Sequence, residues 1–334
     1  MDPKTARGYR LGALVALLLL AVSVAPVILS KWGSTSSSQD KLPGKDVGRR
    51  GVIRLAGVTA AFYLPLMVAH DEKLFAKYGY DSDLVLFNNN NDMMNSLLHG
   101  DADVSALGSG GAFALEAQSP GRVRFVYGQN NRSYSLLVAR NSPISSLEGL
   151  KGKRIGTWPS PTPPVLLHLL LDKPTGTKFE IIPIEFRFMN QALKKGDVDA
   201  LFNTDVFTQQ AIDSAIGRFL SKFPLEENVM KPFFNGGGLI LGDLQSRRPD
   251  MVKAIRGGLD DAIRMMHDAP SVAQRALVKN LGVSQNIAAA APVDEFVLTR
   301  DIDIAKAQDV ANIFRNAGIL SKAIDVRGMF LKEK

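Results

Sequence analysis

The sequence contains no cysteine, which excludes disulfide bonds, thiolate metal sites and cysteine nucleophiles. It also excludes a lipid-modified N-terminal cysteine, so any attachment to a membrane has to be made by the peptide itself. Histidine is scarce too: there are 4, and none has a second histidine at the spacing of a metal site. We therefore expect no metal site and no cofactor.

Motifs for nucleotides and for hydrolysis are missing as well. The sequence has no Gly-x-x-x-x-Gly-Lys-Ser/Thr loop, no Gly-x-Ser-x-Gly elbow and no His-Glu-x-x-His pair. Gly108-Ser109-Gly110 begins a dinucleotide fingerprint, but Phe113 occupies the position of its third glycine. The net charge is +7, yet the basic residues are scattered, whereas nucleic-acid binders gather them on one face. We expect no nucleic-acid partner.

Only one long hydrophobic run is present, and it lies at the N-terminus. The segment Leu11–Leu29 carries no charge and follows three basic residues. Its length lies between that of a secretory core and that of a membrane span. Ala25 suits a cleavage site, but Pro26 follows it. We predict a signal peptide or an uncleaved anchor over residues 1–30, a flexible linker over 31–51, and export to the periplasm, either released or tethered to the inner membrane.

The rest of the chain contains an internal repeat. A Gly-Asp-x-Asp element closes a helix-like segment at Gly100–Asp103 and again at Gly196–Asp199. Each copy is preceded by strand, loop, helix, strand and helix patterns and followed by a short apolar strand. Glycine suits the position just after a helix end. We interpret the four aspartates as turn and cap residues.

Such alternation predicts an α/β fold in which each copy forms a mostly parallel sheet flanked by helices. A chain of 334 residues has room for two such units. We predict lobe I from residues 52–132 and 238–334 and lobe II from residues 133–237. Two crossover strands, near 133–138 and 236–241, would form a hinge.

Ligands of open α/β sheets bind beyond the carboxyl ends of the strands. Loops around Thr59, Ser109, Thr157 and Thr204 occupy those positions and would converge if the lobes face each other. The candidate ligand-binding residues are Thr59, Phe62, Tyr63, Ser109, Gly110, Arg132, Trp158, Thr162 and Asp205.

Each candidate has a chemical role and a structural alternative. Ser109 and Gly110 head a helix and could offer N–H groups to an anion or carbonyl, or simply cap it. Trp158, like the aromatic residues near Thr59, could stack on a flat ring or belong to the core. Arg132 could pair with a carboxylate or remain at the surface. Asp205 could accept hydrogen bonds from an N–H-bearing ligand or cap its own helix.

Five segments resemble a known family, in the right order along the chain: residues 68–79, 97–103, 144–156, 192–200 and 248–252. They are similar to motifs of periplasmic proteins that bind nitrate, sulfonates, taurine or thiamine precursors (NMT1/THI5-like and SsuA/TauA-like). The match Ile144–Gly156 is the most specific. The resemblance implies a type II periplasmic-binding-protein fold, a small-molecule ligand, a monomer, and delivery to an ABC permease in the inner membrane.

The same resemblance implies a binding protein and not an enzyme. Pyrimidine synthases of this fold use a cysteine-rich motif that the chain lacks, so an enzyme of pyrimidine or thiamine-precursor metabolism is the alternative, followed by a tethered sensor. The segment Pro159–Pro164 departs from the family's Gly-Ser pair, and proline has no N–H group to offer an anion. We expect a partly aromatic or apolar ligand with a polar or anionic end, of the sulfonate, carboxylate or pyrimidine class.

Overall fold

The computed structural model describes residues 51–87, 90–159, 162–172, 176 and 178–331. The predicted signal or anchor segment (1–30) lies outside these residues, as does the predicted linker except for Gly51. None of the described helices is both long enough and apolar enough to cross a membrane. The described residues belong to one compact unit.

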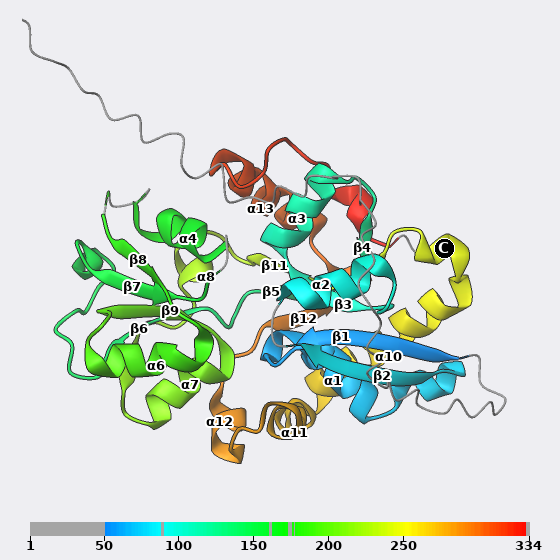
Figure 1. Ribbon diagram of the computed structural model, residues 1–334, viewed down its shortest axis with the longest axis horizontal. Helices are drawn as coiled ribbons and strands as arrows, with labels where there is room; N and C mark the ends of the chain where they lie inside the picture. The colour runs from blue at the N-terminus through cyan, green and yellow to red at the C-terminus, as the bar shows by residue number, and fades with distance from the viewer. Residues whose placement is uncertain (1–50, 88–89, 160–161, 173–175, 177, 332–334) are drawn as a thin grey trace, which may run out of the picture. The chain divides into compact units, whose positions relative to one another are not determined.

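The first sheet brings together strands from both ends of the described chain (Figure 1). Four of its strands follow the order β12-β5-β11-β3, and β4 also pairs with β11. Strands β1 and β2 pair in parallel, and a bridge between Leu55 and Val104 connects β1 to the segment that leads into β3. The bounds are β1 Val52–Val58, β2 Asp81–Phe87, β3 Ser105–Gly108, β4 Val123–Phe125, β5 Tyr127–Asn130, β11 Phe234–Leu241 and β12 Glu295–Leu298.

The second sheet is built only from residues between 135 and 221, in the order β10-β6-β9-β7-β8. Strands β8, β7 and β9 are parallel, while β6 and β10 run antiparallel to their neighbours. The predicted α/β fold class is confirmed, although both sheets are mixed because chain segments return through them in the opposite direction. The bounds are β6 Ser135–Ala139, β7 Arg154–Thr157, β8 Glu180–Pro183, β9 Ala200–Asn203 and β10 Gly217–Ser221.

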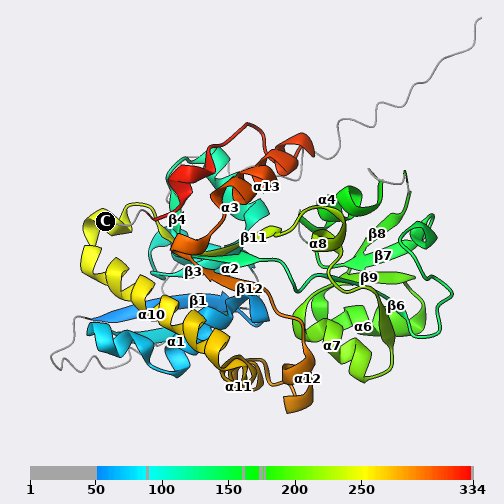
Figure 2. The same cartoon turned by 180° about the vertical axis from the view of Figure 1, so that it is seen from behind.

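Helices cover both faces of each sheet. Both views show α6 and α7 on one face of the second sheet and α4 and α8 on the other (Figures 1 and 2). Helix α1 packs against α10 and α11 beside the first sheet. The bounds are α1 Leu64–Asp71, α2 Asn90–His99, α3 Ser109–Gln118, α4 Thr162–Leu167, α6 Phe186–Lys195, α7 Asp205–Asp213, α8 Pro224–Asn228, α9 Leu244–Arg247, α10 Pro249–Asp268, α11 Pro270–Leu281, α12 Gln285–Ala290 and α13 Ile304–Asn316.

Local sequence signals explain where many helices begin and end. Prolines stand in the first turns of α1, α8, α10 and α11, where the backbone N–H has no partner inside the helix. Helix α6 ends at Gly196, whose φ of 78° is the left-handed conformation that glycine adopts at little cost. The sequence placed a helix start at Pro164. The structure begins α4 at Thr162, two residues earlier, and continues it as a π-helix over His168–Asp172.

The two copies of the Gly-Asp-x-Asp element make the same ion pair. Asp103 accepts hydrogen bonds from the backbone N–H of Arg54 (2.9 Å) and from Nε (3.0 Å) and Nη2 (2.8 Å) of its guanidinium. Asp199 binds Arg154 in the same three ways, at 2.8, 3.1 and 3.2 Å. The interpretation of these two aspartates as turn and cap residues was therefore wrong, because each one ties its loop to the first strand of its own repeat.

We expect Asp103→Ala to lower the free energy of unfolding by about 2 kcal/mol and Asp199→Ala by about 1 kcal/mol, since hydrogen bonds to charged groups contribute roughly 1.5–3 kcal/mol. The Asp103 side chain is 8% exposed and that of Asp199 30%, so water screens the second pair more. Urea unfolding would measure both. Asp101→Ala and Asp197→Ala, which remove exposed aspartates of the same elements, are the controls. Equal losses in all four variants would contradict the ion-pair role.

Two connections join the sheets. One runs through residues 131–134, between β5 and β6, and the other through residues 229–235, from the end of α8 into the first two residues of β11. All eight residues of β11 are buried. The exact lobe boundaries, 132/133 and 237/238, stay a prediction.

Candidate functional site

Buried polar residues gather where the two connections meet the strand ends of both sheets. We call them the junction cluster: Asn131, Ser133, Thr204, Asp205, Asn235 and Asp294. Their exposures are 0%, 2%, 6%, 3%, 3% and 4%. Burying polar groups is costly unless they are hydrogen-bonded, so a cluster this size needs an explanation.

Asp294 binds both connections at once. Its Oδ1 accepts hydrogen bonds from the backbone N–H of Arg132 (3.0 Å) and from the hydroxyl of Ser133 (2.9 Å). Its Oδ2 accepts a hydrogen bond from Asn235 Nδ2 (2.8 Å), on the other connection. Burial raises the pKa of Asp294, and these donors partly offset the effect. Asp294 therefore fixes the two connections to the end of the first sheet.

Asp205 stands opposite, at the first position of α7. Its φ of 54° is left-handed, a strained conformation for a residue other than glycine. Burial, followed by the charge of Asp294, raises its pKa to about 7, while Thr204, Ser133 and the backbone of Ala61 act in the opposite direction. Ala61 lies in the loop after β1, so Asp205 links a loop of the second sheet to a loop of the first.

Several buried polar atoms at the strand ends have no hydrogen-bond partner among the described residues. They are both side-chain atoms of Asn131, the hydroxyl of Thr157 and the Nδ2 of Asn203. Thr157 ends β7 and Asn203 ends β9, while Asn131 follows β5. Unpaired buried groups of this kind occur in functional sites, where a ligand or water satisfies them.

Aromatic rings form a ladder beside this cluster. Trp158 is stacked on Phe186 (5.2 Å between ring centroids, 20° between planes) and nearly parallel to Phe202 (6.1 Å, 12°). Phe186 is in turn stacked on Phe207 (4.9 Å, 16°). The ring centroids of Tyr134 and Trp158 are 5.5 Å apart. Burial, and then the charges of Asp294 and Asp205, raise the pKa of the Tyr134 hydroxyl. The ladder therefore stands next to the two carboxylates.

The structure brings some predicted site residues together. Asp205 reaches the loop that holds Phe62, whose carbonyl accepts a 2.6 Å hydrogen bond from Gln129 Nε2. A methyl group at Gly110 would lie 2.6 Å from the Thr162 hydroxyl. Gly110 in α3 and Thr162 in α4, two helices that cover different sheets, are therefore in contact. Ser109, next to Gly110, is 2% exposed.

The side chains of three other predicted residues have different surroundings. Tyr63 is 3% exposed and packs in the hydrophobic core, with its hydroxyl donating to Asn90 Oδ1 at 3.2 Å. It also contributes to the raised pKa of Tyr134, so it lies near the junction cluster. Thr59 is exposed. The guanidinium of Arg132 is 44% exposed and lies 3.7 Å from Glu226 and 3.9 Å from Glu295. Its observed partners are thus acidic side chains of the protein.

Sequence patterns missed the residues that organise this region: Asn131, Tyr134, Phe186, Phe207, Asn235 and Asp294. Phe207 lies in the helix that follows the Thr204 loop, so extending that loop into α7 would have found it. Phe186 begins α6 after β8, at a strand end that was not among the loops considered. Asp294 gave no signal, because its partners are 59 to 162 residues away in the sequence.

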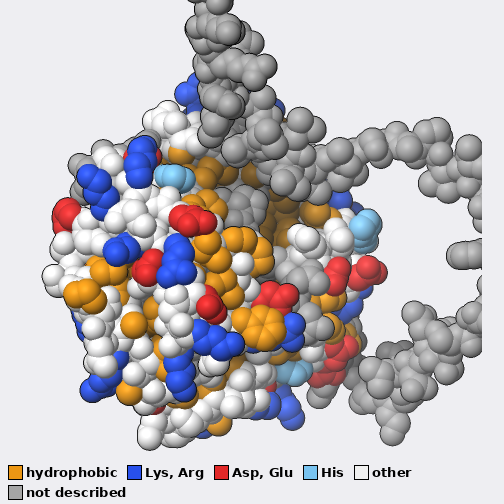
Figure 3. Space-filling model, turned by 60° about the vertical axis from the view of Figure 1, so that its left-hand side comes forward, with side chains coloured by type: hydrophobic (Ala, Val, Ile, Leu, Met, Phe, Trp, Pro, Cys, Tyr) orange, Lys and Arg blue, Asp and Glu red, His pale blue; other side chains and the backbone are white. Residues whose placement is uncertain are grey.

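The face drawn in Figure 3 carries basic and acidic side chains interspersed, with hydrophobic side chains between them. No single-sign field covers it. A nucleic acid would require a concentrated basic surface, so this face offers none of that kind.

Comparison with known families gives one match over most of the chain. The family model described as "NMT1/THI5 like" matches residues 61–273. A search of curated proteins found no significant match.

Solved structures with the same fold include both binding proteins and an enzyme. The periplasmic aliphatic sulphonate-binding protein SsuA from Escherichia coli has a TM-score of 0.70 and 17% identity, covering 85% of this chain and 92% of its own. The alkanesulfonate-binding protein SsuA from Xanthomonas axonopodis pv. citri, bound to MOPS, has a TM-score of 0.69 and 17% identity, covering 86% of this chain and 100% of its own. The desulfurization enzyme DSZB has a TM-score of 0.66 and 16% identity, covering 84% of this chain and 97% of its own. At these identities the likeness establishes a shared periplasmic-binding-protein fold.

Proposed function

Because the chain belongs to the NMT1/THI5-like family, we propose that it is a solute-binding protein that holds a small organic ligand between its two sheets and delivers it to an ABC permease. One observation carries the proposal: unpaired buried polar atoms and an aromatic ladder meet at the strand ends. A binding protein needs such a place, with apolar walls and a few oriented polar groups.

The chemistry of this region favours a particular kind of ligand. A flat ring would complement the ladder of Trp158, Phe186 and Phe207, since aromatic rings prefer stacked or edge contacts. The junction cluster contains two carboxylates, Asp205 and Asp294, and no basic side chain. A sulfonate would meet repulsion there, whereas a ring that bears N–H groups would find acceptors. Within the classes expected from the sequence, we therefore propose a pyrimidine-like ligand over a sulfonate.

Binding would depend on closure of the two predicted lobes. Asp205 of one sheet's loop accepts a hydrogen bond from Ala61 of the other's, and Gly110 touches Thr162. These contacts would have to break to admit a ligand. The connections held by Asp294 would remain fixed and act as the hinge, because one side chain binds both of them.

An enzyme on the same fold is the second candidate, and the likeness to the desulfurization enzyme DSZB favours considering it. The absence of cysteine removes the thiol chemistry expected of the pyrimidine synthases.

For location, we propose the periplasm, with the uncharged run Leu11–Leu29 as export signal or anchor. Cell fractionation would test this, and recovery of the chain from the cytosol would refute it.

Native mass spectrometry of the freshly purified protein is the first test, because a co-purified ligand would reveal its mass. Thermal shift with aminopyrimidines and with aliphatic sulfonates then compares the two classes. We expect stabilisation by the former, of about 2.7 kcal/mol at 100 times the dissociation constant. Chemical conversion of the stabilising compound would favour the enzyme instead.

Phe186→Ala is expected to weaken binding of that ligand about 10-fold or more, since stacking on an aromatic side chain contributes about 1–3 kcal/mol per base. Phe188→Ala is a matched control: it lies two residues further along α6, and its side chain is 52% exposed. Titration calorimetry would measure both. Equal affinities of the two variants would remove the aromatic ladder from the site.

A further inference from the structure

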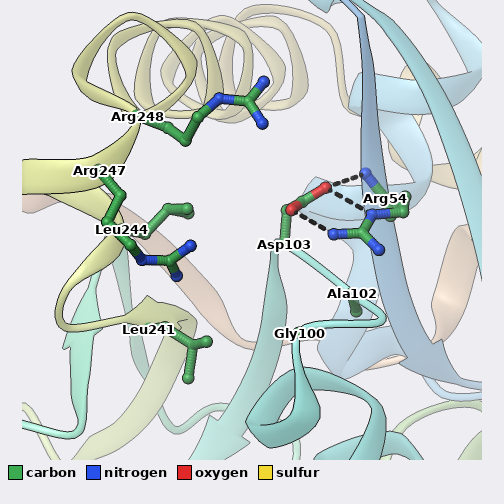
Figure 4. A pocket seen from close by; sticks show the side chains of 8 residues that line it. All are labelled: Arg54, Gly100, Ala102, Asp103, Leu241, Leu244, Arg247 and Arg248. Atoms are coloured by element: carbon green, nitrogen blue, oxygen red, sulfur yellow. Dashed lines mark hydrogen bonds and ion pairs between the residues drawn. The ribbon is translucent and has the colours of Figure 1, made fainter.

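A pocket lies apart from the junction cluster and shares no residue with it. It has a volume of about 140 Å³ and is enclosed by β1, the loop before β3, and the segment that joins β11 to α10 (Figure 4). Two of the family-like motifs, at residues 97–103 and 248–252, contribute to its wall, although the proposed ligand site uses neither. The lining residues are Arg54, Gly100, Ala102, Asp103, Leu241, Leu244, Arg247 and Arg248.

Three guanidinium groups converge on this pocket. Arg54 is held by Asp103, and Arg247 is held by Asp243 at 2.9 and 3.1 Å. Arg248 has no ion pair or side-chain hydrogen bond within the described ranges. Figure 4 shows the side chains of Arg247 and Arg248 extending toward the Arg54–Asp103 pair across the pocket. Three cations thus face two carboxylates that are already engaged.

The surroundings of Arg247 and Arg248 contain carboxylates as well as open space. Hydrogen bonds from Arg247, and more weakly the charge of Arg122, lower the pKa of Asp243, which therefore remains ionised and paired with Arg247. A neighbouring hollow of about 450 Å³ shares Arg247 and Arg248 and is also lined by Tyr80, Pro249, Asp250 and Met251. The two arginines therefore border enough space for a group larger than a single ion.

We propose that this pocket binds a phosphate-type oxyanion through Arg248 and Arg247, presented either by free phosphate or by the headgroup of an anionic phospholipid. The planar guanidinium fork matches two oxygens of such an anion. The Arg54–Asp103 pair forms the opposite wall, and because both oxygens of Asp103 accept hydrogen bonds from Arg54, that carboxylate is neutralised locally. This site is independent of the proposed solute-binding function.

The experiment uses the full-length chain in a neutral detergent. It is titrated with inorganic phosphate, with dihexanoyl phosphatidylglycerol and with dihexanoyl phosphatidylcholine, which carries no net charge. We expect saturable binding of the anionic probes, weakened as salt is added. The double variant Arg247→Ala/Arg248→Ala should lose at least about 10-fold in affinity, and Arg248→Gln should lose part of it. The matched control is Arg315→Ala, which removes an exposed arginine on α13.

Each outcome decides the question. Tighter binding of phosphatidylglycerol than of inorganic phosphate supports the site and assigns it to a lipid headgroup, while equal binding supports it as a site for free phosphate. The proposal is overturned if neither anion binds saturably, if phosphatidylcholine binds equally well, or if Arg315→Ala weakens binding as much as the double variant. Circular dichroism of Arg248→Gln confirms that the fold is retained.

Discussion

The Asp205→Asn variant is expected to be more stable than the unmodified protein above pH 7 and to depend less on pH below it. Asp205 is 3% exposed, and burial raises its pKa to about 7. In the unfolded chain an aspartate ionises near pH 3.9. Between these two values the folded state holds a proton that the unfolded state has lost.

The sign follows from this difference in bound protons. Stability falls with pH wherever the folded state binds more protons than the unfolded state. Asp205 therefore stabilises the fold fully below about pH 4, progressively less up to about pH 7, and not at all above it. A shift of roughly three pH units corresponds to a loss on the order of 4 kcal/mol across this range. Asparagine cannot ionise, so it removes the share of the slope that Asp205 contributes, while the buried Asp294, whose pKa is also raised, keeps its own share.

Asparagine is also the substitution that the backbone tolerates, because it adopts left-handed φ values such as the 54° of Asp205 more readily than most residues. Urea unfolding between pH 4 and pH 9 would give the two stability curves. Asp213→Asn, an exposed carboxylate on the same helix, should keep the slope of the unmodified protein. If Asp205→Asn keeps it as well, the carboxylate titrates in the ordinary range and the site is wetter than described.

The local pattern of the sequence predicted much of the fold. The repeated Gly-Asp-x-Asp element and the alternation of strands and helices identified both α/β units. This was possible because hydrophobic periodicity and the glycines and prolines that end an element are set by residues close together in the sequence. The direction of β6, β10 and β11 could not be predicted in that way. A strand carries no local mark of which neighbour it pairs with, so the mixed character of both sheets depends on the tertiary arrangement.

The candidate site shows the same division. Asp205, Trp158, Gly110 and Thr162 were found because they follow strand ends. Asp294 could not be found, since its role depends on partners brought together only by folding. Arg132 was considered as a partner for a ligand carboxylate. In the structure, Glu226 and Glu295 lie within 4 Å of its guanidinium. Roles that depend on burial or on partners distant in the sequence cannot be predicted from motifs and residue spacing.

Gly236→Ala is expected to cost at least about 4 kcal/mol of stability and to leave little folded protein, since native domains are stable by only about 5–15 kcal/mol. Gly236 has a φ of 123°, which a residue with a side chain rarely adopts. A methyl group there would lie 2.2 Å from the carbonyl oxygen of Leu107 and 2.7 Å from the backbone nitrogen of Ser109. Both are backbone atoms, which cannot rotate away.

The consequence reaches the site because of where Gly236 lies. It pairs with Gly108 on β3 and follows Asn235, the residue through which Asp294 holds the second connection. Gly196→Ala is the matched control. Its φ of 78° is also left-handed, but no atom lies within 4 Å of the added methyl group, so strain alone should cost about 1–2 kcal/mol. Thermal unfolding separates the two. Equal melting temperatures would mean that β11 can shift away from β3, and the connection would then be a flexible one instead of a fixed hinge.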